Sequence, residues 1–316
     1  MLSDKSLTVI IVACLAAVGI AAGIKINQSS QVVISSPLVF VPRHVTTEPD
    51  PSFFAPATNV EPVVGVAIVD PLKIPGVTAR AYLIGDTVTG NIFTDYNSQK
   101  VLPVASMSKL VTAFVTTDIV SASSTIEITP AALLAPPDRS GLMEGERFTR
   151  SEILYPLLLS SSNIAAEALS SSTEDRPEFL ELMSSYSWEI GMPNSFFADP
   201  SGVSPQNAAT ARDIFALAGY LVNYRPDILA ITRVPIMEVA TTSEHGSHIF
   251  QSTHPFVTDP RFIGGKTGRT PEAGETMVTI MNIGGKKVAV VVLGSQNRES
   301  DTRILLRKAE AMLSAQ

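Results

Sequence analysis

The chain has 316 residues, 45% of them hydrophobic, and a formal net charge of −7 at pH 7. This length is enough for one large domain or two modest ones, with a sizeable core. The acidic balance, with a pI near 5.2, argues against nucleic acid as a partner. The single cysteine is Cys14, so the rest of the chain has neither a disulfide nor thiol chemistry.

The N-terminal segment is strongly apolar. Residues 7–24 carry no charge, a run near the lower limit for a membrane-spanning helix and long for a signal peptide. We expect residues 1–25 to be an uncleaved membrane anchor; the alternatives are a signal peptide cut near residues 21–23 and a lipid anchor at Cys14. All three export the rest of the chain. Residues 26–62 are rich in Ser, Pro and Thr and are expected to form an extracytoplasmic linker, followed by one folded domain over 63–316.

Strands are expected first in the folded domain, and helices follow them. Residues 79–86 and 91–96 have the composition of two strands joined as a hairpin. Helical spacing follows over 104–119, and then a loop-rich stretch over 120–150. Further helices are expected after the capping box of Thr149 and Glu152, from residue 163, over 177–190, and over 210–224.

The C-terminal part returns to strands. Residues 275–296 contain two β runs around Gly284 and Gly285, which predicts a hairpin, and residues 299–316 have the pattern of a closing amphipathic helix. Strands at both ends of the domain, with a helical block between them, predict an α/β fold of the α+β type. The predicted architecture is a central, mainly antiparallel sheet flanked by helices, with an inserted helical subdomain.

Ser106 and Lys109 form the first of three short motifs, S-x-x-K, where a helix is expected to begin. Positions i and i+3 share a helix face, so the lysine lies beside the serine. A serine hydroxyl needs a base to become a nucleophile, and a lysine can be that base if its ammonium form is destabilised. The alternative is that Ser106 is only an N-cap and Lys109 a solvated helix residue.

The second and third motifs are Ser161-Ser162-Asn163, at a junction between two helices, and the run GGKTG over 264–268. Ser and Asn residues at a junction between two helices usually cap a helix. Glycines within a strand are expected where a ligand backbone approaches closely. A phosphate loop is excluded at residues 264–268, because its pattern requires a glycine where this chain has Pro260.

Together and in this order, the three motifs are the signature of penicillin-binding proteins and class A β-lactamases. The segments 141–169, 190–214, 264–278 and 290–300 extend the likeness. Over roughly residues 79–316 the sequence resembles the serine-type D-alanyl-D-alanine carboxypeptidases, the low-molecular-mass penicillin-binding proteins. This resemblance implies a β-lactamase/transpeptidase-like fold. It also implies export to the cell wall and inhibition by β-lactams.

The resemblance also implies catalytic roles. Ser106 would be the nucleophile and Lys109 its general base. Ser161 would relay a proton toward the leaving nitrogen, and Asn163 would hydrogen-bond the substrate backbone. Lys266 would supply positive charge near the two serine motifs.

The same resemblance implies a set of substrate-binding residues. Thr267 would bind near the substrate carboxylate, and Gly268 would line the same strand. The oxyanion hole would be the backbone N–H groups of Ser106 and Arg269. Arg298 is the candidate for holding the terminal carboxylate, and its alternative is a solvated loop arginine.

The sequence departs from the family pattern beside Asn163. The family commonly has Gly and Asp where this chain has Ser162 and Ile164. Neither is one of the reacting groups, so we expect a local change of packing there and retained chemistry.

The expected function is a membrane-anchored carboxypeptidase that removes D-alanine from peptidoglycan stem peptides through a Ser106 acyl-enzyme, without metal or cofactor. The first alternative is a β-lactamase, which needs a further glutamate to activate water; Glu189 is the nearest candidate. The second is a non-catalytic wall-binding relative. Endopeptidase or transpeptidase action and the diamino acid of the stem peptide stay open. His245 and His248 form an HxxH without further ligands, and we expect solvated loop histidines there.

Overall fold

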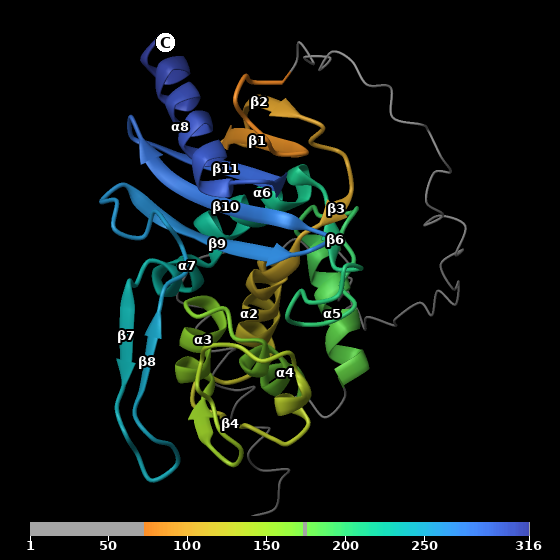
Figure 1. Ribbon diagram of the computed structural model, residues 1–316, viewed down its shortest axis with the longest axis vertical. Coiled ribbons are helices and arrows are strands. Elements are labelled where there is room, and N and C mark those ends of the chain that lie inside the picture. The colour runs from red at the N-terminus through yellow and green to blue at the C-terminus, as the bar shows by residue number, and fades with distance from the viewer. Residues whose placement is uncertain (1–72, 173–175, 316) are drawn as a thin grey trace, which may run out of the picture. The chain divides into compact units, whose positions relative to one another are not determined.

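A five-stranded sheet organises the computed structural model, which describes residues 73–172 and 176–315 (Figure 1). The strand order is β2-β1-β11-β10-β9, and every neighbouring pair is antiparallel. The bounds are Ala81–Asp86 for β1, Ile92–Tyr96 for β2, Phe262–Thr270 for β9, Gly274–Ile283 for β10 and Lys286–Ser295 for β11. Both predicted hairpins are confirmed, and pairing of β1 with β11 joins the two ends of the domain.

The predicted helices are also confirmed. They are α2 Ser108–Ile119, α3 Arg150–Leu158, α4 Asn163–Ser171, α5 Arg176–Glu189, α6 Ala211–Tyr224 and α8 Arg298–Ser314; 3₁₀ turns, η2 and η3, cover Ala105–Met107 and Ala132–Leu134. The Thr149–Glu152 capping box opens α3 as expected, because its local hydrogen bonds depend only on neighbours in sequence.

Several short elements escape sequence-based prediction. They are helix α7 Pro226–Thr232 and three two-stranded ribbons: β3 Leu102–Pro103 with β6 Ala208–Ala209, β4 Thr125–Glu127 with β5 Arg147–Thr149, and β7 Ile236–Val239 with β8 His248–Gln251. Strands of two to four residues carry too few alternating side chains to show a period.

The sheet is buried on both faces. In β11, Val288, Val290 and Val292 belong to a core shared with α8, through Leu305 and Leu306. The alternating residues Ala289, Val291 and Leu293 belong to a second core, shared with α2, α3, α4 and α6. Successive strand side chains point to opposite faces, so β11 holds the two layers together. The predicted fold class, a mainly antiparallel sheet with flanking helices, is therefore confirmed.

The histidines of the HxxH are buried, so their prediction as solvated loop residues was wrong. His248 Nε2 lies 2.8 Å from Glu146 Oε1, and the His245 ring stacks on Phe148 at 4.3 Å between centroids. His254 is also buried, and burial lowers its pKa to about 3. Hydrogen bonds from the Arg147 N–H to the Glu244 carbonyl and from the Gly246 N–H to Glu146 hold this segment against β5 and the residue before it. Among the residues that the structure describes, no group of three or more His, Cys, Asp or Glu could hold a metal.

The predicted anchor and linker, residues 1–62, lie outside the described residues. Within 73–172 and 176–315, every helix is too short or too polar to cross a bilayer.

Asp301 ties the start of α8 to the sheet. Its carboxylate is completely buried and accepts hydrogen bonds from the N–H groups of Thr78 and Ala79 and from the hydroxyl of Ser295. We expect Asp301→Ala to lower the free energy of unfolding by about 2–4 kcal/mol, because it removes the acceptor of the buried Ala79 N–H and of the buried Ser295 hydroxyl. Urea denaturation measures the effect. Glu299→Ala on the exposed face of α8 is the control, and an equal loss in both variants would contradict the prediction.

Candidate active site

Ser106 lies in the 3₁₀ turn that leads directly into α2. It is half-buried, and the residue before it, Ala105, has a positive φ of 51°. The N-cap of the 3₁₀ turn is Val104 and that of α2 is Met107. The alternative that Ser106 is an N-cap is therefore wrong. A non-glycine residue in the left-handed region stores strain, and such residues concentrate at functional sites.

The Lys109 side chain is completely buried beneath Ser106, so the alternative of a solvated helix lysine is wrong. Its Nζ lies 2.9 Å from Ser106 Oγ and donates to Asn163 Oδ1 at 2.8 Å and to the Ser201 carbonyl at 2.6 Å. Amide and carbonyl oxygens only accept, so they take both N–H bonds of a neutral amine. The remaining lone pair of that amine then points to the Ser106 hydroxyl.

The charge state of Lys109 fits this geometry. Burial lowers its pKa from 10.5 to about 7, although the carboxylates of Asp199, Asp138 and Glu167 act in the opposite direction. A large fraction of the amine is therefore neutral near pH 7, and able to accept a proton.

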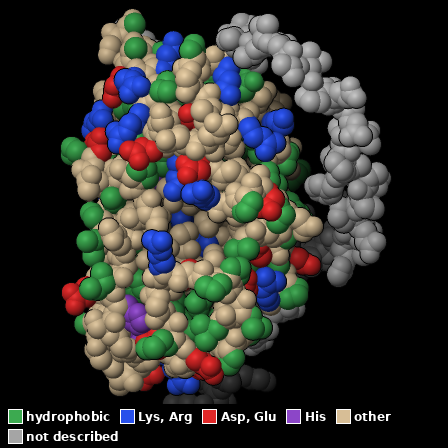
Figure 2. Space-filling model, in the orientation of Figure 1, with side chains coloured by type: hydrophobic (Ala, Val, Ile, Leu, Met, Phe, Trp, Pro, Cys, Tyr) green, Lys and Arg blue, Asp and Glu red, His purple; other side chains and the backbone are tan. Residues whose placement is uncertain are grey.

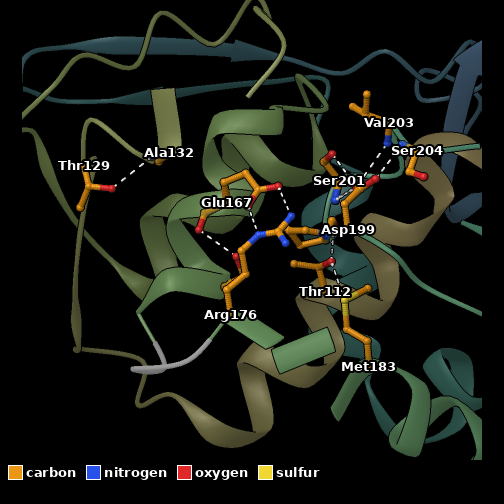
Figure 3. Close-up of polar contacts among 12 residues, drawn as sticks. Thr112, Thr129, Ala132, Glu167, Arg176, Met183, Asp199, Ser201, Val203 and Ser204 are labelled. Atoms are coloured by element: carbon orange, nitrogen blue, oxygen red, sulfur yellow. Dashed lines mark hydrogen bonds and ion pairs between the residues drawn. The ribbon is translucent and has the colours of Figure 1, made fainter. Parts of the chain in front are cut away.

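The Ser201 carbonyl is held in place by Asp199. Figure 3 shows the backbone of residues 201–204 turned toward this carboxylate, whose Oδ1 accepts from the N–H groups of Ser201 and Gly202 and whose Oδ2 accepts from that of Ser204. The loop also bonds α2, because Thr112 Oγ1 donates to the Pro200 carbonyl at 2.5 Å. Asp199 thus fixes one of the two acceptors of Lys109, a role that no short motif revealed.

A second serine–lysine pair faces the first. Lys266 Nζ donates to Ser161 Oγ at 2.9 Å and to the Thr267 carbonyl at 2.9 Å. Ser161, like Ala105, is a non-glycine residue in the left-handed region, with a φ of 60°. Burial lowers the pKa of Lys266 well below its usual value, and the nearby cations Lys109 and Arg298 lower it further.

Glycines allow the backbone around Ser106 to close up. A Cβ on Gly268 would lie 2.8 Å from the Ser106 nitrogen, and one on Gly202 would lie 2.0 Å from the Ala105 carbonyl oxygen. The prediction for the K-T-G glycines invoked the close approach of a ligand backbone. The approach that the structure shows is that of the protein's own turn at Ser106, residues 105–107.

The substrate-binding candidates lie along β9 and beside it. Thr267 is buried, with its hydroxyl 2.9 Å from that of Thr253, and the Arg269 side chain is exposed. Arg298, the first residue of α8, donates from Nη1 to the Gly268 carbonyl at 2.8 Å. It is therefore partly buried and bonded to β9, and its alternative as a solvated loop arginine was wrong. Burial lowers the pKa of Arg298, while Glu275 raises it.

The structure thus brings together the three sequence motifs. Figure 2 shows Lys and Arg side chains in and around a hollow on the face where β9 meets the start of α2 in Figure 1. Glu189, the candidate β-lactamase glutamate, lies instead on an exposed turn at the end of α5. Glu167 faces the site but is engaged with Arg176, 2.7 Å from its Nε.

Known proteins share this fold. A D-alanyl-D-alanine carboxypeptidase of Mycobacterium tuberculosis superposes with a TM-score of 0.69 at 23% identity, covering 80% of this chain and 96% of that one. Penicillin-binding protein D2 of Listeria monocytogenes, in a cefotaxime-bound form, superposes with a TM-score of 0.64 at 26% identity, covering 74% and 96%. The chain is a serine peptidase with the fold of the penicillin-binding proteins.

Sequence comparisons define the family. The model of the peptidase S11 family, D-alanyl-D-alanine carboxypeptidase, matches residues 69–297, and the chain belongs to that family. The D-alanyl-D-alanine endopeptidase of Pseudomonas aeruginosa is 29% identical over 67% of this chain and 69% of its own length. The D-alanyl-D-alanine carboxypeptidase DacC of Escherichia coli is 25% identical over 77% of this chain and 62% of its own.

Proposed function

We propose that this chain removes the terminal D-alanine from peptidoglycan stem peptides through an acyl-enzyme on Ser106. The observation that carries the proposal is the buried amine of Lys109, which lies 2.9 Å from Ser106 Oγ while its N–H bonds are directed at two fixed acceptors. The substrate follows from the family and from the activities after which its members are named.

In the acylation step, the Ser106 hydroxyl gives its proton to Lys109 while its oxygen attacks the carbonyl carbon of the D-Ala–D-Ala bond. The backbone N–H groups of Ser106 and Arg269 stabilise the oxyanion. Collapse of the tetrahedral intermediate breaks the C–N bond, and Ser161 relays to the departing amine of D-alanine the proton that Lys109 took from Ser106, so that Lys109 is neutral again and Ser161 keeps its hydroxyl. Water then hydrolyses the ester, which restores Ser106 and releases the shortened peptide.

The terminal carboxylate of the substrate binds, in this proposal, beside Lys266, Thr267 and Arg298. A bound anion favours the ammonium form of a lysine, so substrate raises the lowered pKa of Lys266. Lys266 then supplies its positive charge when the site is occupied. Asn163, whose Oδ1 is bonded to Lys109, donates the second N–H of its Nδ2 to the peptide backbone, while the first stays bonded to the Pro136 carbonyl.

A second candidate activity is endopeptidase cleavage of cross-linked stem peptides. It is favoured by the names of two relatives, the D-alanyl-D-alanine endopeptidases of Pseudomonas aeruginosa and Escherichia coli, at 29% and 27% identity. The chemistry is the same, and the leaving group differs. Digestion of a D-Ala–D-Ala pentapeptide and of a cross-linked dimer, side by side, separates the two activities.

The site is proposed to act outside the cytoplasm. This rests on the apolar run of residues 7–24, which exports the following chain whether it is retained as an anchor or cleaved. Fractionation of cells that express the full chain, followed by N-terminal sequencing of the mature protein, distinguishes a membrane anchor from a cleaved signal.

Intact-mass spectrometry with benzylpenicillin tests the proposed nucleophile. We expect a lasting adduct that maps to Ser106 and is absent from the Ser106→Ala variant. Release of D-alanine from a D-Ala–D-Ala peptide then establishes the reaction. Rapid hydrolysis of the drug without an adduct would indicate a β-lactamase, and a folded but unreactive protein would indicate a non-catalytic wall-binding relative.

A further inference from the structure

We propose that Asp138 is a positioning residue that fixes the start of α4, and with it Asn163, against Lys109. The inference rests on the proposed function, since it concerns the same acylation step. Asp138 lies outside the three motifs, in the loop between η3 and β5, 25 residues before Asn163 in the chain.

The Asp138 carboxylate gathers the donors at the helix start. Its Oδ2 accepts from Ser162 Oγ at 2.7 Å, from the Asn163 N–H at 2.6 Å and from the Ile164 N–H at 3.1 Å. Its Oδ1 accepts from the Ser140 N–H at 2.8 Å. Burial raises the pKa of Asp138, but the hydrogen bonds from Ser140, Ser162 and Ile164 together outweigh it, so that the pKa lies below its usual value. The residue is therefore a carboxylate at neutral pH.

This contact differs from an ordinary helix cap, because α4 already has one. The Ser162 hydroxyl accepts from the Ala165 N–H at 3.0 Å, as an N-cap does. The first two N–H groups of a helix normally have no partner within it. In α4, those of Asn163 and Ile164 are bound by Asp138, from a separate loop.

Asn163 is consequently held at three points. Its backbone N–H donates to Asp138, its Nδ2 donates to the Pro136 carbonyl at 3.1 Å, and its Oδ1 accepts from Lys109. Two of these three contacts come from the loop 136–138. The loop thus determines where the amide lies, and so where one of the two fixed acceptors of Lys109 lies.

The departure from the family pattern acquires a physical account here. Where relatives commonly have an aspartate after the Asn, this chain has Ile164, which is buried in the core. In this chain a carboxylate also lies at the start of α4, but it belongs to Asp138, which is 25 residues earlier in the sequence. The loop 136–140 is therefore bonded directly to the start of α4 beside the site.

Asp138 also acts on Lys109 through its charge. The groups acting on this amine are three carboxylates, those of Asp199, Asp138 and Glu167, and the opposing amine of Lys266. A carboxylate favours the ammonium form, so removing the Asp138 charge lowers the pKa of Lys109 further. The neutral base then persists to lower pH, and the acid limb of the acylation rate moves to lower pH.

Benzylpenicillin acylation of the full-length protein from about pH 5 to about pH 10 tests the proposal on Asp138→Asn. We expect the plateau rate to fall by about 10-fold or more through misplacement of Asn163, and the acid limb to move to lower pH. Asp213→Asn is the matched control, because this buried carboxylate bonds the N–H of Thr210 at the start of α6. We expect it to lower the melting temperature and to leave the limb in place.

The outcomes are distinguishable. If the wild-type protein is not acylated at Ser106, the proposed function fails. If the wild type is acylated and Asp138→Asn keeps both its plateau rate and its acid limb, or loses rate only in step with lost folded protein as Asp213→Asn does, Asp138 has no positioning role. Asp138→Glu, which retains the charge, is expected to keep the wild-type limb even where its plateau rate is lower.

Discussion

Replacing Lys109 by methionine is expected to reduce acylation by benzylpenicillin by about 10²–10⁴-fold, the range that a general base contributes. Methionine is nearly as long and suits a fully buried site, so the change removes the amine and keeps most of the packing. The Ser106 hydroxyl then has no acceptor for its proton at 2.9 Å.

The pH dependence identifies the group. Burial lowers the Lys109 pKa to about 7, so the amine is an ammonium below that pH and a neutral base above it. Acylation of the wild type is therefore expected to rise with pH through about 7 and then level off. Stopped-flow rates across pH provide the measurement, with the exposed Lys286→Met as control. An acid limb that persists at the same pH in Lys109→Met would assign the base to another group.

The sequence predicted the elements whose signals are local. The capping boxes at Thr149 and Thr210 start α3 and α6 because the cap and its partner are three residues apart. The hairpin around Gly284 and Gly285 likewise follows from a turn and its flanking β runs. Elements that depend on distant partners, such as β3 with β6, have no comparable local signal.

The candidate site, like the fold, was predictable only where its residues form a sequence motif. The three motifs identified both serine–lysine pairs, because their residue types and order are specific. The supporting residues, Asp199 and Asp138, lie in loops and act through backbone N–H groups, which leave no pattern in the sequence. Asp199 does lie in a segment that resembles the family, and this was the one available signal.

The prediction for His245 and His248 failed because of contacts that are distant in the sequence. The lack of further metal ligands around His245 and His248 led to the prediction of solvated loop histidines, yet both are buried and pack against Phe148 of β5. Burial of a polar side chain requires a partner, and for His248 the partner is Glu146, about 100 residues earlier in the chain. Single-sequence patterns do not reveal a contact at that separation.

Gly202→Ala is expected to reduce acylation by about 100-fold, although residue 202 carries no reacting group. The new Cβ would lie 2.0 Å from the Ala105 carbonyl oxygen and 2.9 Å from the Ser106 nitrogen. Real Cβ contacts are never this short, so either the loop 199–204 or the turn at Ser106 must move. Movement of the loop displaces the Ser201 carbonyl from Lys109, and movement of the turn displaces Ser106.

Gly285→Ala is the control that separates this clash from backbone strain. Gly285 and Gly202 both have a φ of 81°, so alanine costs the same left-handed penalty, about 1–2 kcal/mol, at each position. A Cβ at Gly285 meets nothing within 4 Å. Acylation per mole of folded protein, with the folded fraction taken from circular dichroism, is therefore expected to stay at the wild-type level in Gly285→Ala and to collapse in Gly202→Ala. Similar acylation rates in the two variants would contradict the prediction. They would mean that the position of the turn at Ser106 does not depend on the loop 199–204, which Asp199 holds.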